Sequence, residues 1–208
     1  LEHDTDALLN KMRGISFVVN PTRQDAITRG TLSNDDFDGE MDDVSYHIES
    51  IEEKGLPIDP INAYNLFAIY LRWCIEHDLM GEDFLNEYGE VAKQVKADPA
   101  SVDLRAFIRD KLNGQIMVPM FNKIGRAFTS YYYGEPDSPN FPRDIENYAL
   151  EYLGPEKYYS DEFQFKAPLF IPFDEDYYQA MAKVIEERFT NWQGQDFDED
   201  TLEPSEVA

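Results

Sequence analysis

The chain has 208 residues, of which 42 are Asp or Glu and 18 are Lys or Arg, so its formal net charge is −24. A chain this acidic disfavours direct binding to nucleic acid and to anionic membranes, and it favours basic partners. Aromatic residues make up 14% of the chain and hydrophobic residues 42%, which argues against a disordered protein and predicts a substantial core.

Composition divides the chain into three expected parts. Residues 1–40 are interpreted as an N-terminal extension packed on the core, and residues 41–193 as one helical domain. Residues 194–208 carry six acids and no Lys or Arg, which is typical of a solvated end of a chain. We therefore expect an acidic, disordered tail there.

The acidic charge is concentrated where the expected domain begins. Residues 35–53 contain nine acids and no Lys or Arg, whereas residues 93–126 contain seven bases and three acids. The acidic run continues into Val44-Ser45-Tyr46-His47-Ile48, whose aromatic and β-branched side chains indicate an ordered start to the domain. The sequence leaves open whether residues 35–43 form a solvated loop or a binding surface.

The most distinct predicted helix covers residues 60–80. Pro60 suits a first helical turn, Asp59 is a candidate N-cap, and Gly81 is the expected stop. Apolar side chains occur on most sides of this helix, as is usual for a helix buried at the centre of a domain.

Apolar spacing predicts five further helices, over residues 82–95, 102–112, 121–133, 144–153 and 174–192. Between the last two, residues 169–171 are interpreted as a short edge strand, because Pro168 and Pro172 exclude a central one. The predicted fold class is mainly α, with about six helices in a single compact domain and minor short β segments.

No cofactor site, metal site or catalytic group is predicted. The three histidines, His3, His47 and His77, lack the spacing of a zinc site. Residues 34–39 repeat half of a calcium-loop pattern, but Ser45 stands where the loop needs a bidentate Glu. We therefore expect a binding protein rather than an enzyme.

The compartment is predicted from what the sequence lacks. Cys74 is the one cysteine, so no disulfide forms within the chain. No run of about 18 apolar residues suits a membrane span, and the first residues do not show the pattern of a secretory signal. We expect the protein to be located in the cytoplasm.

Five motifs follow one another along the chain. They are Asp42-Asp43-Val44-Ser45-Tyr46-His47, Leu71-Arg72-Trp73-Cys74-Ile75-Glu76-His77, Gly125-Arg126-Ala127-Phe128 with Tyr131-Tyr132, Tyr158-Tyr159-Ser160-Asp161-Glu162-Phe163, and Arg188-Phe189-Thr190-Asn191-Trp192. In this order they resemble an uncharacterised bacterial family found among the immunity proteins of polymorphic toxin systems. The similarity spans roughly residues 41–192, and Tyr46 stands where the family is expected to have Trp.

The resemblance implies inhibition by binding, with no catalytic residues to transfer. We therefore expect an immunity protein whose acidic surface blocks a cognate toxin that has a basic surface. The expected contact residues are Asp35, Asp36, Asp38, Asp42, Asp43, Tyr46 and Glu49.

Two other functions stay open at this point. A small-molecule-binding domain or enzyme would require His47 and His77 to converge on a pocket. An acidic nucleic-acid mimic would instead bind many basic proteins rather than one.

Overall fold

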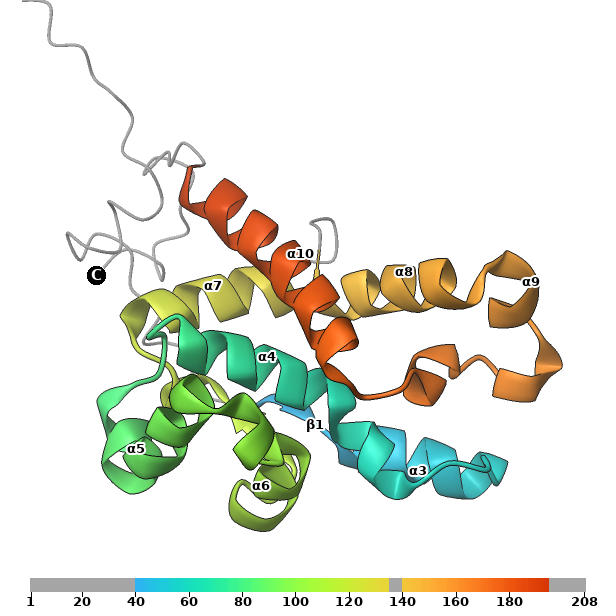
Figure 1. The fold of residues 1–208 in the computed structure, drawn as a ribbon, viewed down its shortest axis with the longest axis horizontal. Coiled ribbons are helices and arrows are strands. Elements are labelled where there is room, and N and C mark those ends of the chain that lie inside the picture. The colour runs from blue at the N-terminus through green and yellow to red at the C-terminus, as the bar shows by residue number, and fades with distance from the viewer. Residues whose placement is uncertain (1–39, 135–139, 195–208) are drawn as a thin grey trace, which may run out of the picture.

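The computed structural model describes residues 40–134 and 140–194, and within them the chain is mainly helical, as predicted (Figure 1). The α-helices of this part are α3 (Ser45–Lys54), α4 (Asn65–Glu76), α5 (Glu82–Ala97), α6 (Leu104–Lys111), α7 (Lys123–Gly134), α8 (Phe141–Leu153), α9 (Pro155–Tyr158) and α10 (Glu175–Gln193). Short 3-10 helices join them: η1 (Pro60–Tyr64), η2 (Pro99–Ser101), η3 (Val118–Met120), η4 (Asp161–Phe163) and η5 (Ala167–Phe170). The expected N-terminal extension and acidic tail lie outside the described residues, apart from their boundary residues 40 and 194.

Helix α4 forms the centre of the fold. It packs against α5, α6 and α10, and the side chains of Tyr70 and Trp73 are fully buried. The predicted N-cap is confirmed, because the Asp59 carboxylate accepts a hydrogen bond from the Ile61 amide at 2.9 Å. Pro60 opens the 3-10 turn η1, and the α-helix proper begins at Asn65.

The predicted helix end at Gly81 is wrong. Helix α4 ends at Glu76, shortly before Asp78 takes the left-handed conformation with φ of +58°. Gly81 instead precedes α5, and its amide donates to the Met120 carbonyl at 2.8 Å. A Cβ at this position would lie 2.9 Å from the Phe121 carbonyl oxygen, so the close approach of two backbones requires glycine.

Strands β1 (Glu40–Asp43) and β2 (Gln115–Met117) form a two-stranded antiparallel sheet. Asp42 pairs with Ile116 and Asp43 with Gln115, and a register shift separates Glu40 from Asp42. The edge strand expected at residues 169–171 is wrong, because this segment is covered largely by η5, which has Pro168 in its first turn. Minor β structure is therefore present, but elsewhere in the chain.

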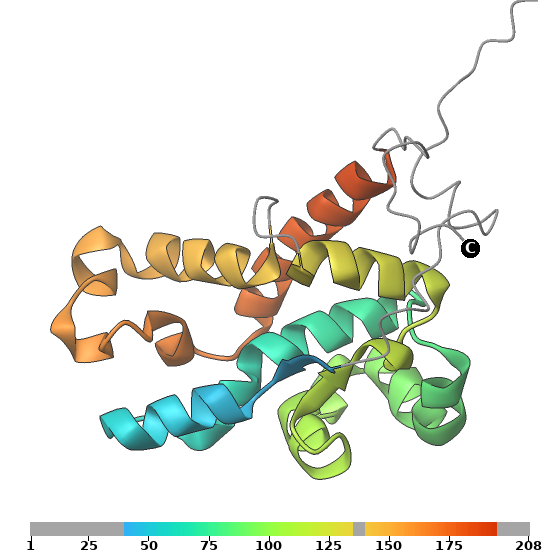
Figure 2. The ribbon, with the colours of Figure 1, turned by 180° about the vertical axis from the view of Figure 1, so that it is seen from behind.

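Helices α7 and α8 follow one another along the molecule, and α10 crosses beside them and α4 (Figures 1 and 2). A buried carboxylate joins the three outer helices. Asp144 of α8 accepts a hydrogen bond from the Tyr132 hydroxyl of α7 at 2.7 Å and two from the Arg188 guanidinium of α10 at 3.0 and 2.9 Å. The charge is thus paired and hydrogen-bonded, as burial requires.

Helix α3 lies at the same end of the molecule as α9 and the connection from α9 to α10 (Figures 1 and 2). A direct contact joins these distant parts of the sequence, because the Gln164 side-chain amide donates to the Lys54 carbonyl at 3.1 Å. None of the helices in the described ranges has the length and apolar character needed to cross a membrane.

Candidate partner-binding surface

The structure separates the seven predicted contact residues into three groups. Three lie outside the described residues, two lie in β1, and two lie on α3. In that order they are Asp35, Asp36 and Asp38, then Asp42 and Asp43, and then Tyr46 and Glu49.

Asp42 and Asp43 shape the junction between β1 and α3. The Asp43 carboxylate accepts hydrogen bonds from the Ser45 hydroxyl, the Ser45 amide at 2.7 Å and the Gln115 side-chain amide at 2.9 Å. These bonds, that of the Ser45 hydroxyl first, lower the pKa of Asp43. Asp42 accepts a bond from the Asp43 amide at 2.9 Å. Both carboxylates are therefore engaged within the chain.

The outward face of α3 is both aromatic and acidic. Tyr46, Glu49 and Glu53 recur at helical spacing and lie on one face, and the Tyr46 side chain is 64% exposed. Glu49, Glu52 and Glu53 are exposed, and none of them forms an ion pair with a described Lys or Arg. This face therefore presents unneutralised negative charge beside an exposed ring.

Tyr46 contacts a residue that is distant in the sequence. The Lys166 ammonium, between η4 and η5, lies 4.4 Å from the centre of the Tyr46 ring and 3.3 Å from its hydroxyl oxygen. A cation over the face of an aromatic ring is attracted to it. The contact therefore orients the Tyr46 ring while leaving most of it in solvent.

His47 is a half-buried neighbour of this surface. Its ring packs edge-on against Phe67, with 5.9 Å between ring centres. Burial, with a smaller contribution from Lys166, lowers the pKa of His47 to about 4. The imidazole is therefore neutral near pH 7 and adds no positive charge to the acidic face.

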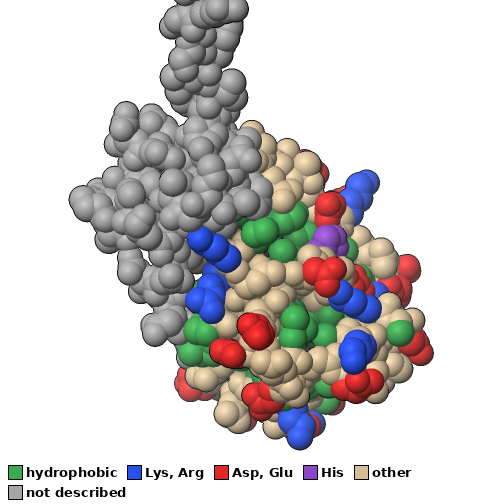
Figure 3. All heavy atoms as spheres, turned by 90° about the vertical axis from the view of Figure 1, so that its left-hand side faces the viewer, with side chains coloured by type: hydrophobic (Ala, Val, Ile, Leu, Met, Phe, Trp, Pro, Cys, Tyr) green, Lys and Arg blue, Asp and Glu red, His purple; other side chains and the backbone are tan. Residues whose placement is uncertain are grey.

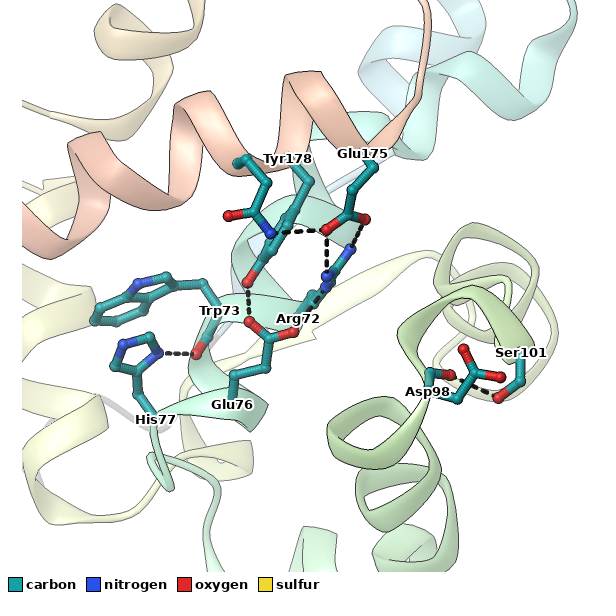
Figure 4. Close-up of polar contacts among 9 residues, drawn as sticks. Arg72, Trp73, Glu76, His77, Asp98, Ser101, Glu175 and Tyr178 are labelled. Atoms are coloured by element: carbon teal, nitrogen blue, oxygen red, sulfur yellow. Dashed lines mark hydrogen bonds and ion pairs between the residues drawn. The ribbon is translucent and has the colours of Figure 1, made fainter.

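His77 is the residue that follows the C-terminal end of α4 (Figure 4). Its ring stacks on Trp73, its Nδ1 is 2.8 Å from the Trp73 carbonyl oxygen, and its Nε2 is 2.8 Å from a Glu186 carboxylate oxygen. His47 instead contacts Phe67, near the start of α4, and ten residues of helix span roughly 15 Å. The two histidines do not meet at one site.

Arg72 joins α4 to α10 through contacts that the sequence did not indicate (Figure 4). Its guanidinium donates to Glu76 at 2.8 Å and to both carboxylate oxygens of Glu175 at 2.7 and 2.9 Å. It also lies 3.5 Å from the centre of the Tyr178 ring, whose hydroxyl donates to Glu76. All of these contacts lie within the chain, so the cluster fixes α4 to α10.

The remaining candidate groups are a metal-ligand set, the thiol of Cys74 and the residues around a pocket. Among the described residues, no group of three or more His, Cys, Asp or Glu is placed to hold a metal ion. Cys74 is buried, and burial raises the pKa of its thiol, which suppresses the reactive thiolate. A pocket of about 480 Å³ between the end of α4 and α5 is lined mainly by the chain from Ile75 to Lys96 and contains neither His47 nor His77.

Comparison with known protein families identifies a domain within the chain. Residues 40–161 match the profile of a domain of unknown function, DUF7832. The match begins with β1 and ends at the first residue of η4, so it contains α3 and α4 and leaves out α10. No curated protein and no solved structure matches the chain.

Proposed function

The chain belongs to the DUF7832 family, and we propose that it is an immunity protein that binds a cognate toxin and blocks its active site. The toxin presents a basic surface, and the block is steric and electrostatic. The proposal includes action in the cytoplasm without a cofactor, a catalytic step or direct contact with nucleic acid.

One observation carries this proposal, namely the unpaired acidic face of α3 beside exposed Tyr46. Two arginines of the fold are used elsewhere, because Arg72 pairs with Glu175 and Arg188 with Asp144. Lys54 at the end of α3 and Lys166 over the Tyr46 ring are the cations near this face, and neither forms an ion pair with Glu49, Glu52 or Glu53. Opposite charge on a partner speeds its capture and favours the correct partner over others. A partly exposed Tyr adds contact area at low entropic cost, as is common in protein interfaces.

The test is co-expression with the product of the adjacent gene. The intact chain is expected to restore growth of cells that produce this toxin, and the two proteins are expected to purify as a complex. If the gene product is toxic and the intact chain neither protects the cells nor binds it, the proposed function is wrong. Capture of many unrelated basic proteins with no preference would favour a nucleic-acid mimic instead.

Charge reversal then tests the acidic face. The variant Glu49→Lys/Glu53→Lys is expected to slow association with the toxin about tenfold or more at low salt, with a smaller loss at high salt where charges are screened. Its matched control is Glu87→Lys/Glu90→Lys on α5, which changes the net charge equally through exposed residues. Equal slowing by both variants would show that net charge alone matters and that the α3 face does not.

A further inference from the structure

Most of the exposed large hydrophobic side chains belong to segments in one half of the molecule. Of the five such side chains among the described residues, only Leu85 lies on α5. The other four belong to α3, α8, the residue after α9 and the turn between η4 and η5, and these segments share the half of the molecule that carries α9 (Figures 1 and 2). These four are Tyr46, Tyr152, Tyr159 and Phe165.

Phe165 is the most exposed of them, with 89% of its surface in solvent. Its φ is +63°, and that of the preceding Gln164 is +46°. Left-handed backbone is unfavourable for any residue with a Cβ, and a bulky side chain there is uncommon. The fold therefore keeps an apolar ring in water on a strained turn, and such strain is often found where a protein binds its ligands.

The turn is fixed on both sides of Phe165. Phe163 is buried and packs on Phe170, with 4.6 Å between ring centres. On the other side, the Lys166 amide donates to the Phe163 carbonyl at 2.8 Å, while its ammonium reaches Tyr46. The backbone is thus held by its neighbours, so the direction in which the Phe165 side chain leaves the chain is set before any partner arrives.

Acidic side chains accompany these rings. Exposed carboxylates lie on α3, at α9 and in η4, and none of them forms an ion pair with a described Lys or Arg; they are Glu49, Glu52, Glu53, Glu156, Asp161 and Glu162. Figure 3 shows the opposite end of the molecule, where Lys and Arg are mixed with Asp and Glu. The segments that carry the exposed rings also contain Lys54, Lys157 and Lys166, so these six carboxylates outnumber the cations beside them.

We propose that Phe165 is the apolar anchor of the partner interface, inserting into an apolar pocket of a protein whose pocket rim carries Lys and Arg. This inference rests on the proposed function and extends its surface from α3 to the turn between η4 and η5. The exposed Tyr46 ring contacts Lys166, the residue that follows the anchor, and buried aromatic anchors within a polar rim carry most of the binding energy in such interfaces.

Charge selects this occupant over others. A second copy of the chain would bring carboxylates against carboxylates, and like charges in contact oppose association. An anionic lipid surface or a nucleic acid would be repelled for the same reason. A basic protein gains from both features, because Arg guanidinium groups stack on Tyr rings and pair with carboxylates.

The test measures binding of the toxin from the adjacent gene to the full chain by titration calorimetry. Phe165→Ala is expected to weaken the complex about 30-fold or more, mainly through faster dissociation. Its control, Leu85→Ala, removes an exposed apolar side chain from α5 and is expected to change the affinity less than about twofold, because rim and remote contacts contribute little. Thermal unfolding of both variants checks that each is folded.

The outcomes separate the two proposals. If the chain protects cells and binds the toxin while Phe165→Ala binds within twofold of the intact chain, the anchor is wrong and the immunity function stands. An equal loss in the Leu85→Ala variant would also refute the anchor. If the intact chain does not bind or protect, both proposals fall together.

Discussion

Replacing Phe165 with glycine is expected to stabilise the chain relative to alanine at the same position. With φ of +63°, an alanine there bears a folded-state cost of about 1–2 kcal/mol that glycine avoids. Glycine has more freedom in the unfolded chain, which costs it about 0.5–1 kcal/mol. The difference favours Phe165→Gly over Phe165→Ala by about 0.75 kcal/mol, the middle of a range of about 0 to 1.5 kcal/mol.

Urea unfolding of both variants measures this difference, and an ordinary helical position supplies the opposite sign. At exposed Lys183 within α10, Lys183→Gly is expected to be less stable than Lys183→Ala by about 1 kcal/mol. The difference in the free energy of unfolding between the Gly and the Ala variant therefore has opposite signs at the two positions, which a uniform effect of glycine would not produce. If glycine is the less stable choice at both positions, the left-handed turn and the strain argument for Phe165 are refuted.

Two further predictions concern buried groups. Asp144→Ala is expected to lower the free energy of unfolding by about 3–5 kcal/mol and the melting temperature by roughly 10 °C, because it leaves Arg188 and the Tyr132 hydroxyl without their partner. The exposed Asp161→Ala variant is the control. A similar loss of stability in both variants would contradict the role of the Asp144 cluster. The pKa of His47 is 6.5 in the unfolded chain and about 4 in the folded chain. Between these two pH values the unfolded chain binds more protons than the folded chain, so the free energy of unfolding decreases as the pH falls. The intact chain is expected to lose about 3 kcal/mol more than His47→Gln between pH 7 and pH 4, measured by urea unfolding, and parallel losses would rule out a buried neutral imidazole.

Most of the helices follow from local patterns in the sequence. The apolar spacing over residues 82–95 and 174–192 corresponds to α5 and α10, and Asp59 caps its helix as predicted. The mistakes occur where tertiary contacts overrule local preference. Glycine is a common helix stop, yet the role of Gly81 is to let two backbone segments approach each other closely. Strand β2 is only three residues long, and its pairing with β1 bridges more than 70 positions of the chain, so no periodic signal marks it.

The seven residues chosen as partner contacts remain a prediction, and the fold decides which of them face solvent. Tyr46 and Glu49 are exposed, but the engagement of Asp43 with Gln115 depends on strand pairing that the sequence does not show. The partner of Arg72, Glu175, is 103 positions away, so no local pattern marks this pair. Phe165 gave no signal, because a Phe in an aromatic-rich segment is usually expected in the core, and only the surrounding fold imposes its left-handed backbone.

The acidic surplus around the exposed rings also governs how the chain behaves toward copies of itself. Aromatic side chains held in water promote self-association when they meet. The carboxylates of α3 and η4 are expected to make two such surfaces repel, which would keep free copies of the chain apart while the proposed contact surface stays open. This protection weakens as salt screens the charges. Concentrated stocks are therefore expected to stay clear at low salt and to become turbid first at high salt, and Phe165→Ala is expected to remain clear in both.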